Sequence, residues 1–156
     1  MTFPTVSGSN LLRQKLTLPQ DLQGELNLVF IPFQQWQQSE VDSWITLAGQ
    51  LEETYKGLYY YELPTIQSKG VLYRTFINEG MRAGIPNPKS RERTITLYLD
   101  KPEFRAALSM LDEDHIYILL IDRQGNEFFR ARGPYSPESE TAVRQTLEQM
   151  IKKERG

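Results

Sequence analysis

Short apolar runs and amphipathic stretches alternate along this chain. The run Leu26–Pro32 (LNLVFIP) is apolar at nearly every position, which is typical of a strand buried on both faces in a parallel sheet. Apolar side chains then recur every three or four residues over Val41–Tyr55, as on one face of a helix. After Gly57, the run Leu58–Leu63 (LYYYEL) has the composition of a second strand. The pattern therefore predicts a strand–helix–strand unit with a right-handed crossover.

The middle of the chain is less regular. The spacing of its apolar residues predicts a helix over Ser68–Arg82, and glycines and prolines then predict a loop over Ala83–Arg93. Thr94–Leu99 (TITLYL) is β-branched and aromatic, which favours a strand. Pro102–Leu111 has apolar residues at helical spacing, with proline at the start, where a helix tolerates it.

The last third of the chain has the clearest pattern. Ile116–Asp122 (IYILLID) predicts a buried strand, Arg123–Asn126 (RQGN) a turn, and Glu127–Arg132 the returning strand of a hairpin. Ser136, followed by a proline and a glutamate, is typical of a helix start. An apolar face that continues to Ile151 predicts that this last helix is long.

The chain has the organisation of one domain. We expect residues 1–17 to form a polar N-terminal arm and residues 18–156 to form a single domain, because no repeat, linker or low-complexity stretch divides them. A chain of 156 residues can build one core without disulfides or a metal.

Composition excludes much of enzyme chemistry. The chain contains no cysteine, so it has no disulfide, no thiolate nucleophile and no cysteine-ligated zinc or iron–sulfur site. Its one histidine, His115, argues against a histidine-paired metal site or a Ser–His–Asp triad. The net charge of −2 argues against a globally basic nucleic-acid binder. We therefore expect no enzymatic activity, no metal, no cofactor and no nucleic-acid partner.

The order of the predicted elements is that of thioredoxin-like proteins. These combine a strand–helix–strand unit with a further helix and then a hairpin followed by a helix; the extra strand and short helix before the hairpin resemble the redoxin branch. We therefore expect an α/β fold with a thioredoxin-like, redoxin-type central mixed sheet and helices on both faces. Another open α/β sandwich is the alternative.

The position of the reactive thiols in redox-active members of that fold is altered here. Those thiols lie just after the first strand, at the start of the first long helix, where the helix dipole stabilises a thiolate. In this chain the position reads Pro32–Gln38 (PFQQWQQ), and the proline that would face it before the hairpin is also missing, since residues 114–116 are Asp-His-Ile. Disulfide exchange and peroxide reduction by this chain are therefore excluded.

The altered position leaves two functions open. Trp36, with Gln34 and Gln37 beside it, is a candidate contact surface for a protein partner, because exposed aromatic residues often dominate binding energy. The alternative for the tryptophan is a ring packed over the start of the helix. Alternatively, Phe33 and these three residues line a vacated cleft, and the protein is a small-ligand-binding module or a weak enzyme.

Basic side chains gather in the middle of the chain. In an acidic protein this asymmetry suits an acidic protein partner or a peripheral contact with an anionic membrane. A solvated loop without a partner is the alternative. The basic residues are Arg74, Arg82, Lys89, Arg91 and Arg93.

Two stretches carry a resemblance to a known family. FINEGMRAGIPNPKSRERTITLYLDKPEFRAAL and IYILLIDRQGNEFFRARGPYSPESE resemble the assembly-chaperone family for the membrane sector of the mitochondrial F-type ATP synthase, which is thioredoxin-like and thiol-free. The resemblance covers roughly Leu18 to the C-terminus. It implies a non-catalytic assembly factor or chaperone that acts by binding a protein, such as a subunit of a membrane complex. A permanent structural subunit is the remaining alternative.

The resemblance also bears on location. Mitochondrial members carry a transit peptide, and the polar start of this sequence does not show one. We therefore expect a bacterial or plastid-lineage relative that is cytoplasmic, peripheral at a membrane face, or in the plastid stroma if it is eukaryotic and processed.

Overall fold

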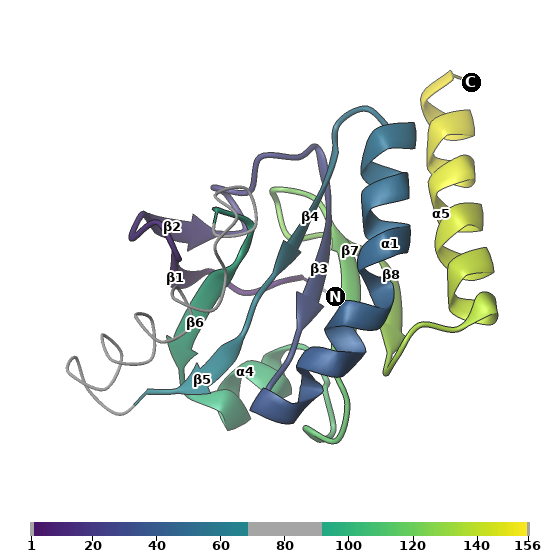
Figure 1. The fold of residues 1–156 in the computed structure, drawn as a ribbon. Helices are drawn as coiled ribbons and strands as arrows, with labels where there is room; N and C mark the ends of the chain where they lie inside the picture. Colours follow the sequence, from purple (N-terminus) through teal and green to yellow (C-terminus); the bar gives the residue numbers. More distant parts are fainter. Residues whose placement is uncertain (1, 69–91, 156) are drawn as a thin grey trace.

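Two four-stranded sheets form the frame of this computed structural model, which describes residues 2–68 and 92–155 (Figure 1). The first sheet has the strand order β4-β3-β7-β8 and consists of β3 (Leu26–Ile31), β4 (Leu58–Glu62), β7 (Tyr117–Ile121) and β8 (Glu127–Arg132). The central strand β3 runs parallel to β4 and antiparallel to β7. This is the predicted mixed sheet, with the predicted parallel strand–helix–strand unit and C-terminal hairpin.

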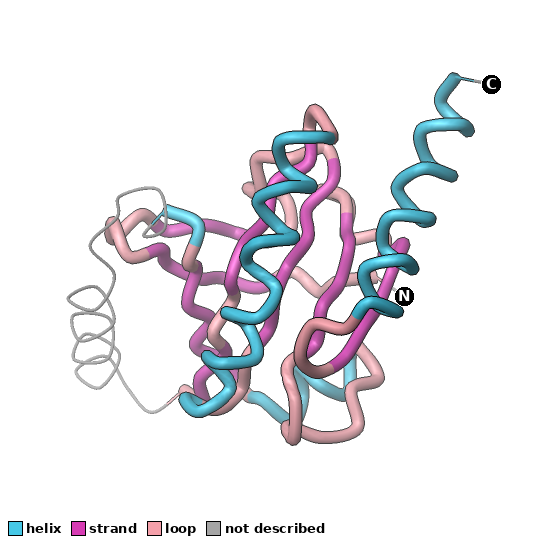
Figure 2. The backbone as a smooth tube through the Cα atoms, turned by 45° about the vertical axis from the view of Figure 1, so that its right-hand side comes forward, coloured by secondary structure: helices cyan, strands magenta, loops and turns pink. Residues whose placement is uncertain are grey.

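Two long helices cover one face of the first sheet. They are α1 (Gln38–Thr54) and α5 (Pro137–Arg155), and α1 crosses in front of the strands in Figure 2. Alternate side chains of β3 and β7 pack against the apolar faces of both helices, because successive residues of a strand point to opposite faces of a sheet. Trp44 of α1 is fully buried there, and its indole nitrogen donates a hydrogen bond to the carbonyl oxygen of Gly133 at 3.0 Å.

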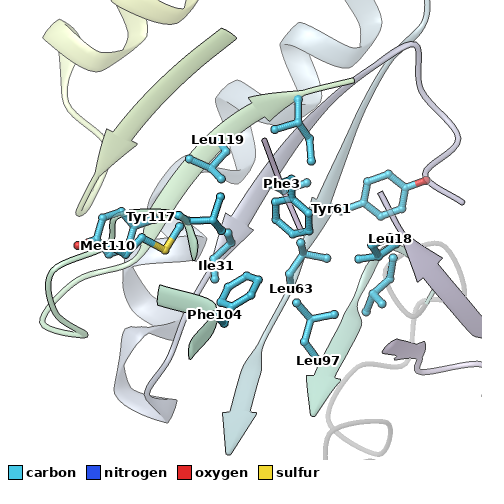
Figure 3. Close-up of a cluster of buried hydrophobic side chains, with 14 of the residues drawn as sticks. Phe3, Leu18, Ile31, Tyr61, Leu63, Leu97, Phe104, Met110, Tyr117 and Leu119 are labelled. Atoms are coloured by element: carbon cyan, nitrogen blue, oxygen red, sulfur yellow. The ribbon is translucent and has the colours of Figure 1, made fainter. Parts of the chain in front are cut away.

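The opposite face of the first sheet is covered by α4 (Lys101–Ala107) and by the second sheet. The second sheet has the order β2-β1-β6-β5 and consists of β1 (Val6–Asn10), β2 (Lys15–Leu18), β5 (Thr65–Gln67) and β6 (Ile95–Leu99). Its apolar side chains meet those of β3, β4, β7 and α4 in one buried cluster (Figure 3). The central strands β3 and β7 are thus buried on both faces, as the continuous apolar runs of both strands predict.

The N-terminal residues differ from the sequence-based expectation. Residues 1–17, expected as a polar arm, contain β1 and most of β2, and β1 pairs with β6 as well as with β2. Phe3 and Leu11 are buried. The hairpin is held by backbone pairing and by a few apolar side chains, Phe3 and Leu11 outside its strands and Leu18 at the end of β2. Most of its strand residues are polar or glycine. Its strand residues therefore look like an arm in the sequence.

The predicted second strand is also divided. β4 ends at Glu62, and the chain passes through the buried Leu63 and Pro64 into β5, which belongs to the other sheet. The predicted helix over Ser68–Arg82 and the loop that follows it fall almost entirely outside the described residues.

Candidate functional site

The segment between β3 and α1 occupies the position at which thioredoxin-like enzymes carry their thiols. β3 ends at Ile31, the chain continues through the buried Pro32 and Phe33, and a short 3-10 helix, η1 (Gln35–Gln37), leads into α1. The start of α1, α4 and the loop before β7 gather at the same end of the molecule, at the bottom of Figure 1.

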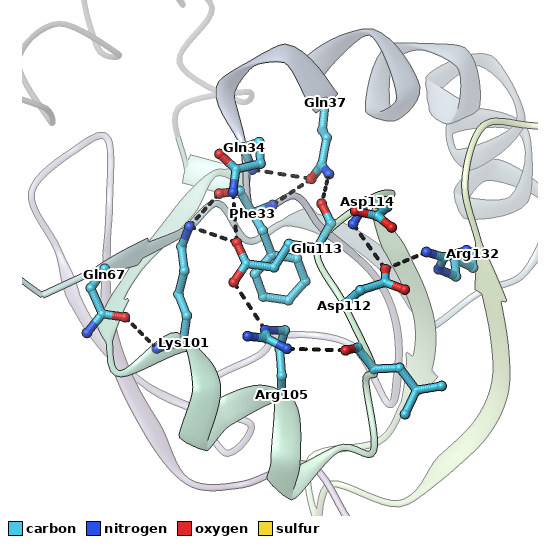
Figure 4. A network of polar contacts seen from close by, with 11 residues as sticks. Phe33, Gln34, Gln37, Gln67, Lys101, Arg105, Asp112, Glu113, Asp114 and Arg132 are labelled. Atoms are coloured by element: carbon cyan, nitrogen blue, oxygen red, sulfur yellow. Dashed lines mark hydrogen bonds and ion pairs between the residues drawn. The ribbon is translucent and has the colours of Figure 1, made fainter.

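Gln37 is the central side chain of this segment and has an exposed fraction of 0%. Its Oε1 atom accepts hydrogen bonds from the backbone N–H groups of Phe33 at 2.8 Å and Gln34 at 3.3 Å. Its Nε2 atom donates to the carbonyl oxygen of Glu113, in the loop before β7 (Figure 4). One amide side chain therefore provides hydrogen-bond partners for the backbone of the turn before the helix. It also joins that turn to the loop in which redox-active members of the fold have a proline.

The carboxylate of Glu113 joins three parts of the chain. It accepts hydrogen bonds from Gln34 Nε2 at 2.8 Å, Lys101 Nζ at 3.1 Å and Arg105 Nε at 3.1 Å. Lys101 also donates to the carbonyl oxygen of Phe33 at 2.7 Å. Figure 4 shows these side chains converging from η1, α4 and the loop. Hydrogen bonds between ionised groups are roughly twice as strong as neutral ones, so the network fixes the three segments relative to one another.

A buried carboxylate of α1 contacts the residues just before β7. The carboxylate of Glu40 accepts a hydrogen bond from the backbone N–H of Ile116 at 3.0 Å and lies 2.6 Å from Nδ1 of His115. Glu40 was not among the residues predicted from the sequence, although a carboxylate directly before the apolar face of a predicted helix could have suggested a buried polar contact. His115 lies in the loop before β7.

These contacts fill the vacated reaction site. Phe33 and Gln37 are buried, and the polar atoms of Gln34, Gln37 and Glu113 bond to one another. A groove of about 550 Å³ lies elsewhere, between the C-terminal parts of α1 and α5 and the β7–β8 turn, and none of the four residues expected to line a cleft takes part in it. The described residues therefore do not support the alternative of a small-ligand site in the former thiol position.

Trp36 lies at the surface of the closed site. Its exposed fraction is 58%, so the packed arrangement over the helix start is not what the structure shows. Leu111, in the loop between α4 and β7, is 89% exposed. The structure thus brings Gln34, Trp36 and Gln37 together in one short segment, with only the two glutamines engaged in the network.

Arg93 is placed away from this segment. Its guanidinium pairs with Glu52 of α1 at 2.5 Å, donates to the carbonyl oxygen of Tyr60 at 2.9 Å and lies 4.6 Å from the ring centre of Tyr59. With a side chain only 12% exposed, Arg93 links α1 to β4 in this structure. The other basic residues expected to bind a partner, Arg74, Arg82, Lys89 and Arg91, lie outside the described residues.

Two carboxyl groups near the closed site have shifted pKa values. Burial raises the pKa of Glu62, at the end of β4, to about 7, and the nearby charge of Asp42 adds to this, while a hydrogen bond from Gln38 opposes it. In the loop before β7, hydrogen bonds from the backbone of Asp114 and from Arg132 lower the pKa of Asp112.

Among residues 2–68 and 92–155, no group of three or more histidine, aspartate or glutamate side chains is arranged to hold a metal ion. In the same residues, no helix has the length and apolar character that crossing a membrane requires.

Comparison with solved structures identifies the fold. The chain is similar to the thioredoxin domain of a thiol-disulfide oxidoreductase from Bacteroides vulgatus, with a TM-score of 0.58 and 17% identity over 93% of this chain and 94% of that one. It is also similar to copper-bound ScoI from Arabidopsis thaliana, with a TM-score of 0.60 and 14% identity over 96% and 99%. BsSco, a member of the Sco family of cytochrome c oxidase assembly proteins, gives a TM-score of 0.63 and 11% identity over 94% and 92%. The fold is thioredoxin-like, as the element order predicts.

Comparison of sequences gives two results. No curated protein matches the chain. A family model described as "ATP10 protein" matches residues 1–148. This match includes the N-terminal hairpin, which lies before the stretch that carries the resemblance in the sequence.

Proposed function

Because this chain belongs to the ATP10 protein family, we propose that it is a non-catalytic assembly factor that binds a subunit of the membrane sector of the F-type ATP synthase. The family is one of ATP synthase assembly. The observation that carries the proposal is the closed thiol position, in which Gln37 and Glu113 fill the site of the chemistry and leave Trp36 exposed beside it.

The chemistry of that position supports the absence of catalysis. The chain has no thiol, and the side chains in its place are saturated with hydrogen bonds. Both functional atoms of Gln37 are engaged, and the carboxylate of Glu113 accepts from three donors. Side chains held in this way are not free to move toward a substrate, and their lone pairs already accept hydrogen bonds from neighbouring groups, which does not suit a nucleophile or general base.

Binding of a protein is supported by the exposed tryptophan. Tryptophan is among the residues that most often dominate the energy of an interface, because its large rigid ring buries much apolar surface at little cost in side-chain entropy. Trp36 is more than half exposed on a segment that buried contacts hold in place. Arg74, Arg82, Lys89 and Arg91 remain part of the proposal as a second contact, with an acidic segment or anionic head groups.

The mechanism is transient shielding. The factor holds an apolar or charged segment of a membrane-sector subunit until that subunit meets its partners in the complex. A fold whose former reaction site is filled by hydrogen-bonded side chains has a rigid surface there. This suits the role, because a rigid surface loses little conformational entropy on binding.

A deletion strain tests the proposed function. We expect loss of the protein to reduce the amount of assembled ATP synthase, measured on native gels and as ATP hydrolysis by membranes, and the full chain to restore it. A tagged chain should also retain a membrane-sector subunit from solubilised membranes, in less than one-to-one amounts. Normal assembly in the deletion strain, together with a pull-down without ATP synthase subunits, would contradict the proposal.

A further inference from the structure

The two most exposed large apolar side chains of the described residues are Trp36 and Leu111. They lie on two segments that the buried network joins. Gln37, directly after Trp36, donates to the carbonyl oxygen of Glu113, which is two residues beyond Leu111. Arg105 bonds both the carboxylate of Glu113 and the carbonyl oxygen of Leu111. The two segments that carry these exposed side chains are therefore held next to one another, at the end of the molecule where the start of α1, α4 and the loop before β7 gather (Figure 1).

The backbone beneath these two side chains is fixed before any partner arrives. Gln34, Glu113 and Lys101 connect the start of η1, the loop and α4 through hydrogen bonds of 2.7 to 3.1 Å, and Figure 4 shows these contacts together with that of Gln37 to the loop. A binding surface that is already ordered avoids part of the entropy cost of association. This arrangement distinguishes the pair from Phe128, which is 41% exposed on the edge strand β8.

The start of α1, α4 and the loop before β7 carry more carboxylates than cations. The cations of this region are engaged, Lys101 and Arg105 with Glu113, and Arg132 with Asp112. Four further carboxylates are exposed and form no ion pair among the described residues. They are Asp42, Asp100, Glu103 and Asp114.

We propose that Trp36 and Leu111 form a docking surface for a protein segment in which bulky apolar side chains are flanked by lysine or arginine. The apolar side chains would cover Trp36 and Leu111, and the exposed carboxylates would attract the flanking cations, because complementary charge steers association and fixes register. Lysine and arginine gather beside the ends of membrane-spanning helices, so a segment at such an end has this chemistry. The inference rests on the proposed function and names the chemistry of its partner.

The same negative charge disfavours an anionic membrane at this face, since like charges repel across the interface. The basic stretch in the middle of the sequence, by contrast, suits an anionic partner. The partner segment is therefore cationic. Binding to an anionic lipid surface instead of the peptide would overturn the proposal.

Binding of a synthetic peptide to the full chain tests this surface. The probe is a short peptide with a leucine- and phenylalanine-rich centre and lysines at both ends, and its counterpart carries glutamates in place of the lysines. We expect titration calorimetry to show at least about tenfold weaker binding of the glutamate peptide, and weaker binding of the lysine peptide as ionic strength rises. Trp36→Ala should weaken binding of the lysine peptide by about tenfold or more.

Matched variants locate the contact. Leu111→Ser should weaken binding of the lysine peptide, and Asp114→Lys should weaken it while reducing its salt dependence. Phe128→Ala removes an exposed aromatic ring from the edge strand and should leave binding unchanged. Retained near-ultraviolet circular dichroism from the buried Trp44 would show that each variant is folded.

Three results would overturn the inference: equal binding of the two peptides, no effect of Trp36→Ala, or a blue shift of Trp36 fluorescence with anionic phosphatidylserine vesicles and not with the peptide. These outcomes are separate from the proposed function. If the peptide does not bind while the deletion strain still loses assembled ATP synthase, only the docking surface is wrong. If the peptide binds as expected while assembly is normal without the protein, the proposed function is wrong.

Discussion

At the level of single residues, Gln37 decides how the closed site is built. Its amide group is both acceptor and donor, so one side chain can serve the N–H groups before the helix and a carbonyl group in the facing loop. A residue with only an acceptor or only a donor could not make both sets of contacts. The position after β3 is therefore held by a neutral group where related enzymes hold a charged thiolate.

Replacing Gln37 by alanine should destabilise the protein by about 2–4 kcal/mol, because buried groups of Phe33 and Glu113 would lose their hydrogen-bond partner. The measurement is the free energy of unfolding from urea titrations. Gln35→Ala, at an exposed neighbouring position, serves as control and should stay within about 0.5 kcal/mol of the parent chain. Equal stability of the two variants would contradict the structural role of Gln37.

Glu62 should make stability depend on pH. Its pKa is raised by burial to about 7 in the folded chain, so the folded protein binds a proton more tightly than the unfolded one. Stability from this group is present in full below the usual carboxyl pKa and is lost as the pH rises through about 7.

The test compares the parent chain with Glu62→Gln between pH 4.5 and 8 by urea unfolding. The glutamine variant should be more stable at the alkaline end, by up to about 3 kcal/mol, and the difference should shrink toward acid pH. A difference between the two chains that stays constant over this interval would show that Glu62 titrates normally.

At the level of elements, close backbone approach explains why β1 tolerates so little bulk. A Cβ atom at Gly8 would lie 2.8 Å from the side chains of Ile95 and Leu97 and 2.9 Å from the carbonyl oxygen of Thr96, all in β6. The absence of a side chain at this position therefore allows β1 to lie against β6. A glycine between polar residues is usually interpreted as a turn. Gly8 instead marks a close approach of two strands.

Alanine substitutions at two glycines should have opposite effects. Gly8→Ala should destabilise the chain by about 1–3 kcal/mol, because β1 and β6 must separate to admit a methyl group. Gly49→Ala, inside α1 with no atom beyond its own helix backbone within 4 Å of the added Cβ, should stabilise it by about 0.5–1 kcal/mol. Thermal and urea unfolding of the pair measure both effects, and a shift in the same direction for both would contradict the packing at Gly8.

At the level of the whole molecule, the N-terminal hairpin is part of the core. β1 pairs with both β2 and β6, and Phe3 and Leu18 belong to the buried cluster that also contains Phe104 of α4. The second sheet depends on β1, which lies between β2 and β6 in the strand order. The hairpin thereby supports the face of the first sheet opposite α1 and α5.

A chain that begins at Leu18 should therefore not fold stably. Deleting the preceding residues removes β1 and exposes apolar residues that the hairpin covers, among them Leu97 and Ile95. We expect loss of the cooperative thermal transition, measured by circular dichroism. A truncated chain with the transition temperature of the full one would show that the hairpin is a dispensable arm, as the sequence suggests.

Much of the first sheet could be predicted from the sequence. The apolar runs of β3 and β7, the helical spacing in α1 and the turn residues of the β7–β8 hairpin are local signals, and each arises from a period or a turn chemistry that neighbouring residues set. The loss of thiol chemistry follows from composition alone. The candidate contacts Gln34, Trp36 and Gln37 were also predicted as one group, because they are neighbours in the chain.

The closed site itself was decided by the tertiary structure. Gln37 and Glu113 are 76 residues apart in the chain, as are Glu40 and Ile116, and no local pattern links such partners. The pairing of β1 with β6 also joins distant segments. It is made by backbone groups, which every sequence carries, so no local pattern predicts it. The sequence determined which elements form and that no thiol chemistry remains, whereas the fold determined which side chains meet at the vacated position, because those contacts depend on the packing of distant segments.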